Sequence, residues 1–388
     1  MLVKRQKHTT NLTKKLQQKE ALPKPPEDIF ELVQYPTKIG KMAAYLSKPE
    51  DTAKKLPAII WITGGFPSGG GGSSLWESTS TENEQSARIY RLRGIVMMFP
   101  SLRGGAPDNP GYQEQFYGEV DDVLSAYDYV SKLKHVDPKR IYLGGHSTGG
   151  TLALLVAAST DKFAGVLSLG PTANDYGEDR APYEWTAKEQ LLRRPLAHLD
   201  SIKIPTYIVE GEHGNSDSLE KLRKANKNPR VTVIQVDQGD HYNVIHPVNS
   251  ITASAIHDSK DGSLALKENE VRLSYLKEAK RKRETTDLET LTTYRGEGMD
   301  LSKPRTVTFY VFSRDESACK QAAEDGTKQA FDVVGPEEHK DSDGDPYFAV
   351  KLNKRLNLTK LQALFDASKA ASDIARNLDI QYDDWTAK

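Results

Sequence analysis

The stretch RIYLGGHSTGG, residues 140–150, indicates a short strand that turns sharply into a helix. Its centre is GHSTG at residues 145–149, and the small, apolar run TLALLVAAS follows almost at once. In so tight a turn the positions two before and two after the serine must be very small, and glycine fills both. The serine hydroxyl then projects from the sheet at the positive end of a helix. The pattern predicts a nucleophile elbow with Ser147 at its tip.

Short apolar runs rich in Val and Ile lie on both sides of the elbow, and longer amphipathic stretches separate them. Such runs, bounded by Gly or Pro, are typical of buried parallel strands. Strands that alternate with helices form βαβ units, so we predict an α/β fold around a doubly wound, mostly parallel sheet. The expected strands lie near residues 41–47, 57–63, 95–99, 140–144, 164–169, 206–210 and 232–236.

The pattern of strands and helices divides the chain into four expected regions. Residues 1–28 are polar and end in several prolines, which indicates a tail or a loosely held helix. The α/β domain is expected over residues 29–262, and a charged helix with a linker that contains Gly and Pro over residues 263–304. Residues 305–388 show the order β-α-β-β-α-β, which predicts a ferredoxin-like α+β domain.

The charge of the chain is nearly balanced, with 53 Lys and Arg against 54 Asp and Glu. No net charge draws the chain to nucleic acid or to an anionic membrane, so we expect neither as a partner. The single Cys319 cannot form an intrachain disulfide. Runs of about 18 apolar residues are absent, and no apolar run follows the basic N-terminus, so we expect no membrane helix, no signal peptide and a cytoplasmic location.

Three stretches of the chain carry a resemblance to a known family. They are WITGGFPSG at residues 61–69, PSLRGGAPDNPGYQEQFYGEVDDVLSAYDYV at residues 100–130, and the elbow with VDPKRI before it at residues 136–141. Through them the chain resembles, over roughly residues 30–255, the prolyl-oligopeptidase-like branch of the α/β-hydrolases. The resemblance implies the α/β-hydrolase fold and a serine hydrolase, either an esterase or a peptidase.

The general base is expected on a loop beyond the last strand, because the base follows the acid along the chain in this fold. Residues 238–242 read QGDHY just after the last expected strand, where the resembling family keeps its catalytic histidine. We therefore predict His241 as the base that takes the proton of Ser147. His246 begins the next helical region, and His146 is expected to pack the elbow with its side chain turned away from substrate.

Acyl transfer also needs two backbone N–H donors for the developing oxyanion. One is expected from Thr148, directly after the nucleophile, and the other from the turn that contains Gly65 and Phe66. The family often has His-Gly-Gly at this turn, where the chain has Thr-Gly-Gly at residues 63–65.

The carboxylate that should orient the base is not settled by the sequence. In the family it lies a few residues beyond the strand that ends here near Glu210, and the usual position falls near Gly214, which has no side chain. Glu210 at the strand tip and Asp217 later in the loop are equal candidates. If both are surface charges, the site is a dyad or the protein is a non-catalytic relative.

The sequence predicts the substrate less precisely than the catalytic residues. Trp76, Tyr183 and Trp185 lie in loops that are expected to line the acyl or leaving-group pocket. Arg103 is expected in a structural charge network with Glu119 and Asp122, with a substrate carboxylate clamp as the alternative. Since no gating domain is present, the expected substrate is a small ester or short peptide. No metal cluster, phosphate loop or dinucleotide fingerprint occurs, so we expect no cofactor and no metal.

The C-terminal region carries a second resemblance. The strand VTFYVFSRDE from residue 307, the late helix and the ending YDDW at residues 382–385 are similar to the ribonuclease E activity regulator B family. The resemblance implies that residues 305–388 bind a protein partner or pack within the chain. This gives an alternative to the hydrolase function. In it the hydrolase domain is catalytically weak or inert, and the protein acts as a regulatory module that binds a protein partner through its C-terminal domain.

Overall fold

The computed structural model describes residues 8–65, 72–77 and 79–388, and the chain divides into two compact units, Met1–Leu276 and Lys277–Lys388. The division falls inside the region that was expected to be a separate helix and linker, residues 263–304. Leu264 and Val271 are buried in the core of the first unit, so this part of the region belongs to it.

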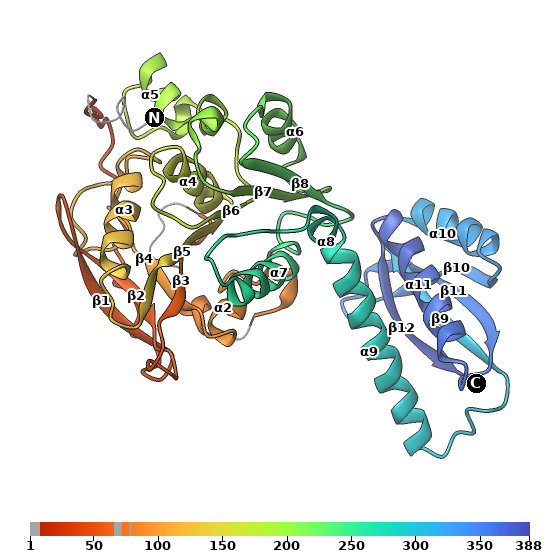
Figure 1. Ribbon diagram of the computed structural model, residues 1–388. Coiled ribbons are helices and arrows are strands. Elements are labelled where there is room, and N and C mark those ends of the chain that lie inside the picture. Colours follow the sequence, from red (N-terminus) through yellow and green to blue (C-terminus); the bar gives the residue numbers. More distant parts are fainter. Residues whose placement is uncertain (1–7, 66–71, 78) are drawn as a thin grey trace. The chain divides into compact units, whose positions relative to one another are not determined.

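The first unit is built on an eight-stranded sheet in the order β1-β2-β4-β3-β5-β6-β7-β8 (Figure 1). β1 and β2 pair antiparallel and β2 runs antiparallel to β4, whereas the pairs from β4 to β8 are parallel. This mostly parallel sheet confirms the predicted α/β-hydrolase fold. The strands are β1 (Phe30–Thr37), β2 (Gly40–Ser47), β3 (Leu56–Ile62), β4 (Val96–Pro100), β5 (Val136–His146), β6 (Val166–Leu169), β7 (Thr206–Gly211) and β8 (Val231–Val236).

Helices cover both faces of this sheet, which explains why its central strands read as continuous apolar runs. α3 (Gly118–Val130), α4 (Thr148–Ala157) and α6 (Ser216–Ala225) bury their apolar residues on one face. The helices on the other face are α2 (Ile89–Leu92), α7 (Ile245–Asp258) and α8 (Glu268–Arg272). The remaining short helices are α5 (Ala187–Arg193), η1 (Gly72–Leu75), η2 (Thr81–Asn83), η3 (Glu178–Arg180), η4 (Pro195–Ala197) and η5 (Leu199–Ser201).

Strand β1 was missing from the sequence prediction. It reads FELVQYPT, in which buried residues are interrupted by exposed, polar ones. Because an edge strand buries only part of its side chains, it lacks the continuous apolar run by which the central strands were found.

Residues 8–20 lie along loops of the first unit instead of forming the expected tail or loose helix. Leu12 pairs with Tyr183 in an antiparallel bridge. The backbone N–H of Gln18 donates to the carbonyl of Gly104 at 2.7 Å. These loops supply the partners that the backbone groups of the segment need, so it is held in place without regular structure of its own.

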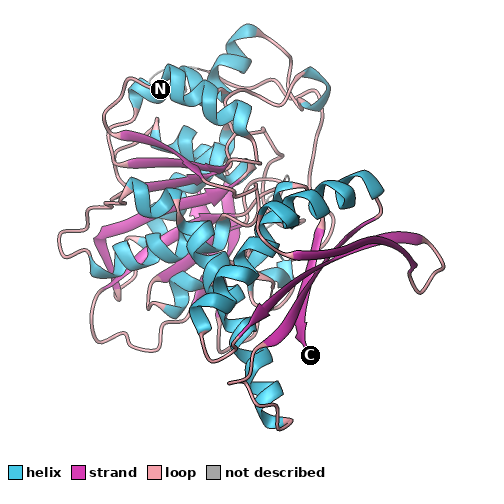
Figure 2. Ribbon diagram, turned by 90° about the vertical axis from the view of Figure 1, so that its right-hand side faces the viewer, coloured by secondary structure: helices cyan, strands magenta, loops and turns pink. Residues whose placement is uncertain are grey.

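The second unit confirms the predicted ferredoxin-like order. Its antiparallel sheet has the strand order β10-β11-β9-β12, which Figure 2 shows as a twisted sheet. The core lies between the sheet and the helices α10 and α11. The elements are β9 (Arg305–Ser313), α10 (Glu316–Lys328), β10 (Asp332–Lys340), β11 (Pro346–Leu356), α11 (Leu361–Asn377) and β12 (Gln381–Ala387).

Helix α9 (Ser274–Gly296) contributes to the core of the second unit, although the sequence suggested a charged helix beside a linker. Leu291 is buried in that core and Tyr294 packs against it. Asp287 is buried too, and its Oδ1 accepts hydrogen bonds from Trp385 Nε1 at 2.9 Å and from Ser368 Oγ at 3.0 Å. The ferredoxin-like fold therefore extends upstream of residue 305.

Asp287→Asn is expected to stabilise the second unit at alkaline pH. Burial raises the pKa of Asp287 to about 6. A carboxyl whose folded pKa is raised favours folding while protonated, so its contribution is lost as the pH rises from about 4 through about 6. The amide keeps the Oδ1 acceptor and removes the charge. We therefore expect the free energy of unfolding to rise by about 1 to 2 kcal/mol at pH 8 and to stay unchanged at pH 4. Calorimetric unfolding of the full chain at both pH values measures this, with the exposed Asp332→Asn as control. An equal effect at both pH values contradicts the assignment.

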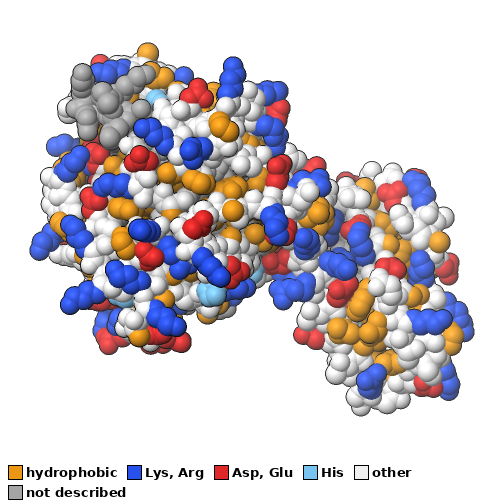
Figure 3. All heavy atoms as spheres, in the orientation of Figure 1, with side chains coloured by type: hydrophobic (Ala, Val, Ile, Leu, Met, Phe, Trp, Pro, Cys, Tyr) orange, Lys and Arg blue, Asp and Glu red, His pale blue; other side chains and the backbone are white. Residues whose placement is uncertain are grey.

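The surface agrees with the balanced charge of the sequence. On the face shown in Figure 3, acidic and basic side chains are interspersed over each unit. Every helix among the described residues is too short or too polar to cross a membrane.

Candidate active site

The turn between β5 and α4 holds Ser147 in a strained conformation, with φ 56° and ψ −116°. Few residues other than glycine adopt such angles, and strain of this kind concentrates at functional sites. The turn is also tightly packed, because a Cβ at Gly145 would lie 2.6 Å from the Gly149 carbonyl group and a Cβ at Gly149 would overlap the Ile62 carbonyl. The close approach of β3 and β5 thus requires both glycines of the GHSTG motif.

His241 lies on the loop between β8 and α7, and its ring faces the carboxylate of Glu210 at the end of β7. His241 Nδ1 is 2.9 Å from Glu210 Oε2. The Glu210 side chain is 1% exposed, and its two oxygens also accept the backbone N–H groups of Gly211 at 2.8 Å and Asn215 at 2.9 Å. A carboxylate held by two backbone donors presents one oxygen to the imidazole in a fixed direction.

Two glycines leave room for the side chains of His241 and Glu210. A Cβ at Gly214 would overlap the Glu210 carboxyl group. A Cβ at Gly170, just beyond β6, would lie 2.5 Å from His241 Cε1 and 3.1 Å from Glu210 Oε2. The absence of a side chain at position 214 therefore gives Glu210 the space to reach His241 from the strand tip.

The other candidate acid lies apart from this pair. Asp217 is exposed in the first turn of α6, and no hydrogen bond joins its side chain to His241 among the described residues. Asn215, which the sequence did not single out, is closer: its Nδ2 donates to the Gly170 carbonyl at 3.2 Å and lies 3.5 Å from His241 Nδ1.

Ser147 and His241 are not joined by a hydrogen bond in the part of the chain that the structure describes. The ring of His241 stacks at a tilt against the ring of His146, with 4.5 Å between their centroids. Contacts between a nucleophile and its base are often loose without substrate and tighten when substrate binds. For His241 to act as the base of Ser147, its side chain must therefore move toward Ser147 when substrate binds.

His146 faces the site instead of turning away from it as expected. Its Nε2 lies 2.8 Å from the backbone oxygen of His241, and Gln85 Nε2 lies 3.2 Å from its Nδ1. Since a carbonyl oxygen only accepts, Nε2 carries the proton and Nδ1 accepts from Gln85. Burial and the adjacent His241 ring lower the pKa of His146 to about 4, which keeps it neutral at ordinary pH.

Removal of the hydrogen-bond donor at position 146 is expected to lower kcat by about tenfold to a hundredfold, because misplacing a catalytic group by about 1 Å can cost that much. Leucine at position 146 fills the space without donating, whereas glutamine can donate to the His241 carbonyl. We expect His146→Gln to retain most of the activity that His146→Leu loses, at every pH from 6 to 9. The measurement is kcat and KM for 4-nitrophenyl acetate, and equal losses in both variants would contradict a positioning role.

Two of the predicted oxyanion donors, Thr148 and Gly65, lie beside Ser147. Thr148 is the first residue of α4, so its backbone N–H has no partner within the helix. Its Oγ1 donates to the Gly65 carbonyl at 3.1 Å, which places the two turns side by side. A Cβ at Gly64 would lie 3.2 Å from Ser147 Cβ. Phe66, the remaining predicted donor, lies outside the described residues.

An open cavity of about 290 Å³ adjoins the nucleophile. It is lined by Thr63, Gly64, Gly65, Ser74, Gln85, His146, Ser147 and Tyr242. No motif in the sequence pointed to Ser74, which lies in η1, or to Gln85, which lies in the turn after η2.

The aromatic residues that were expected to line the substrate pocket do not line this cavity. Trp76 packs against Tyr45 at 5.2 Å between ring centroids. Tyr183 is buried between Trp185, at 6.0 Å, and the guanidinium of Arg193, at 3.7 Å. Tyr183 also pairs with Leu12 of the N-terminal segment, which covers it.

Arg103 is buried in a charge network and does not face substrate. Its Nε and Nη2 contact the two carboxylate oxygens of Asp122 at 3.0 and 2.8 Å, and Nη1 pairs with Glu114. Glu119 is buried beside it and accepts the backbone N–H of Glu114 at 2.7 Å. The guanidinium is fully used, which leaves no carboxylate clamp at Arg103. Among the described residues no group of three or more potential metal ligands is found.

Comparison with known proteins confirms both resemblances. Residues 82–206 match the model of the prolyl oligopeptidase family, and residues 284–386 match that of the regulator of ribonuclease activity B. An uncharacterised peptidase of Bacillus subtilis, YuxL, is 25% identical over 224 residues, which cover 50% of this chain and 32% of the relative. The acyltransferase drtE of Aspergillus calidoustus is 25% identical over 166 residues, 42% of this chain and 50% of the relative. The chain thus spans half or less of these two relatives.

Solved structures with a similar first unit include a puromycin-hydrolysing peptidase of Mycobacterium tuberculosis and an esterase of Pyrococcus furiosus. The peptidase has a TM-score of 0.48 and 17% identity, and the match covers 60% of this chain and 39% of the peptidase. The esterase has a TM-score of 0.47 and 16% identity, with 63% of this chain and 97% of the esterase covered.

Proposed function

We propose that the first unit is a serine hydrolase that cleaves an ester, or a peptide or other amide bond, through an acyl-enzyme on Ser147. The observation that carries this proposal is that strained Ser147, buried Glu210 and His241 follow one another along the chain, at the carboxyl ends of the parallel strands β5, β7 and β8. The match to the prolyl oligopeptidase family supports it.

In the proposed reaction Ser147 Oγ attacks the substrate carbonyl carbon while His241 Nε2 takes the hydroxyl proton. Glu210 accepts a hydrogen bond from His241 Nδ1 and stabilises the imidazolium that forms. The backbone N–H of Thr148 and one from the turn at residues 64–66 hold the oxyanion. His241 then gives its proton to the leaving group, which departs as an alcohol or amine. A water molecule attacks the acyl-enzyme in the same way and releases the carboxylic acid and free Ser147.

The alternative of an inert scaffold rested on the extra C-terminal domain and on the displaced acid, since position 214 has no side chain. The Glu210 carboxylate occupies the space that a side chain there would fill, so this argument against catalysis loses its basis. A protein partner for residues 305–388 stays a prediction.

Labelling with a fluorophosphonate probe tests the proposal, because such probes react only with activated serines. We expect labelling of the wild-type protein and none of Ser147→Ala or His241→Ala. Circular dichroism of the three proteins verifies that they fold equally. Failure of the folded wild-type protein to react would mean that the elbow is not activated, and the hydrolase proposal would be abandoned.

A further inference from the structure

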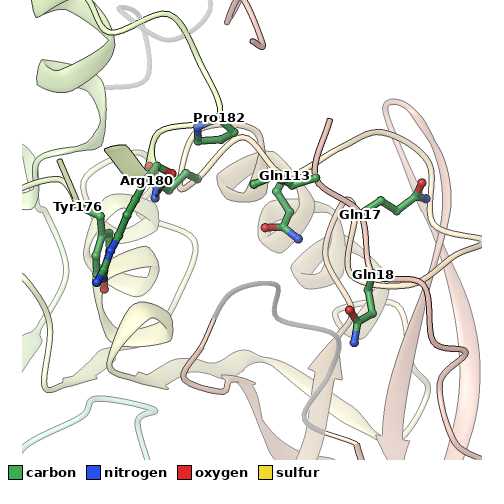
Figure 4. A pocket seen from close by; sticks show the side chains of 8 residues that line it. Gln17, Gln18, Gln113, Tyr176, Arg180 and Pro182 are labelled. Carbon is green, nitrogen blue, oxygen red and sulfur yellow. Dashed lines mark hydrogen bonds between the residues drawn. The ribbon is translucent and has the colours of Figure 1, made fainter. Parts of the chain in front are cut away.

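A second cavity in the first unit, of about 440 Å³, lies between the N-terminal segment and the loops that follow β4 and β6 (Figure 4). Gln18 comes from the N-terminal segment, Gln113 and Gln115 follow β4, and Tyr176 and Arg180 follow β6. Its volume suits a small organic group. Gln113 and Gln115 belong to the stretch of residues 100–130 that resembles the hydrolase family, but no step of the proposed reaction uses the residues of this cavity.

Two of the lining amides have unused hydrogen-bonding capacity. Gln113 is 6% exposed, and its side chain makes no hydrogen bond with any described residue. In Figure 4 its amide points downward from its loop, between Arg180 and Gln18. Gln115 Oε1 is buried and has no partner in the described part of the chain. Since buried polar groups are nearly always paired, the Gln113 amide calls for a polar ligand group or for water. Gln115 Oε1 can only accept a hydrogen bond, so it calls for a donor such as water.

The charge of the cavity is positive. None of the residues that line it is acidic, and Arg180 forms no ion pair with a described residue. Glu178, Asp179 and Arg180 are all exposed, but of the three only Arg180 lines the cavity. A guanidinium beside amide N–H groups matches the planar oxygens of a carboxylate.

One wall of the cavity connects to the nucleophile. Tyr176 stacks on Phe116, with 5.4 Å between ring centroids, and its hydroxyl interacts with Thr151. Thr151 Oγ1 donates to the backbone carbonyl of Ser147 at 3.1 Å. Tyr176 therefore contacts a residue one helical turn from the nucleophile, and a substrate bound at Ser147 must extend past Tyr176 to reach the cavity.

We propose that this cavity binds a carboxylate group of the substrate, with Arg180 as the charged partner and Gln113 as a hydrogen-bond donor. The inference rests on the proposed hydrolase function and narrows the substrate to esters or amides that carry a free carboxylate, such as the half-ester of a dicarboxylic acid.

Two matched pairs of esters test the inference on the full chain. The first pair, 4-nitrophenyl hydrogen adipate and 4-nitrophenyl hexanoate, differs by a carboxylate on the acyl group. The second pair, 4-acetoxybenzoate and 4-methylphenyl acetate, differs by a carboxylate on the leaving alcohol. In at least one pair, kcat/KM of the wild-type protein should be at least tenfold higher for the carboxylate, and Arg180→Gln and Gln113→Leu should bring that ratio toward one. Arg223→Gln, which removes a charge on α6, should keep the wild-type ratio. A ratio near one in both wild-type pairs, or one that survives Arg180→Gln, overturns the inference.

A binding measurement separates failure of this inference from failure of the proposed function. If no ester is hydrolysed, the proposed function fails, and calorimetric titration with monomethyl adipate tests the cavity alone. Binding that weakens at least tenfold in Arg180→Gln supports the carboxylate site. Absence of binding, or equal binding in both proteins, overturns it.

Discussion

Ser147→Ala is expected to lower kcat for 4-nitrophenyl acetate by about 10⁶, which leaves only the residual rate that the oxyanion donors and substrate binding supply. Alanine has no oxygen with which to form the acyl-enzyme, whereas the backbone donors and the pair of His241 and Glu210 stay in place. Because the serine and its base act as one unit, adding His241→Ala to this variant should cause little further loss.

The release of 4-nitrophenolate measures this loss, with Ser159→Ala as the matched control. Ser159 follows the same helix, and its Oγ donates to the Leu155 carbonyl at 2.7 Å, away from the elbow. The control should keep wild-type activity. Turnover in Ser147→Ala within tenfold of wild type would show that another group performs the reaction.

Glu210→Gln is expected to lower kcat by about 10⁴, the loss that follows when a serine-protease aspartate is replaced by its amide. The two carboxylate oxygens of Glu210 accept from Gly211, Asn215 and His241. An amide has one oxygen for these donors, so its NH2 group must face either a backbone N–H or His241 Nδ1. The first arrangement displaces the side chain, and the second places the His241 proton on Nε2, where it cannot accept the proton of Ser147.

Asp217→Asn is the matched control for this prediction, since Asp217 was an equal candidate by sequence. Its exposed side chain does not contact the imidazole, so kcat should stay within twofold of wild type. The opposite pattern, a large loss in Asp217→Asn and little in Glu210→Gln, would mean that the loop of residues 211–217 rearranges when substrate binds.

The features that the sequence predicted well are those with local causes. The elbow is recognisable because the tight turn at Ser147 restricts its neighbours to glycine, and the central strands because burial on both faces makes them continuously apolar. His241 was singled out because the residue order along the chain limits where the base can lie, and its role as the base stays a prediction.

The features that it left open depend on contacts between distant segments. The choice of Glu210 over Asp217 rests on the space at Gly214 and Gly170, which only the packing of β6, β7 and the His241 loop reveals. The role of His146 depends on a carbonyl that lies 95 residues further along the chain.

The N-terminal segment and helix α9 were misjudged for a related reason. Both are polar in sequence, and each is held by partners from elsewhere in its own unit. Trp76, Tyr183 and Trp185 are large aromatics in loops, and the sequence could not show that other segments cover them.

Direct detection of the acyl group on Ser147 tests the central claim. The protein is quenched in acid during turnover of 4-nitrophenyl acetate, digested with trypsin and analysed by mass spectrometry. We predict an added acetyl group on the peptide of residues 141–162, located at Ser147 by fragmentation and absent from Ser147→Ala. Sustained turnover with no acetyl group at Ser147, or with the group on another residue, would contradict the account.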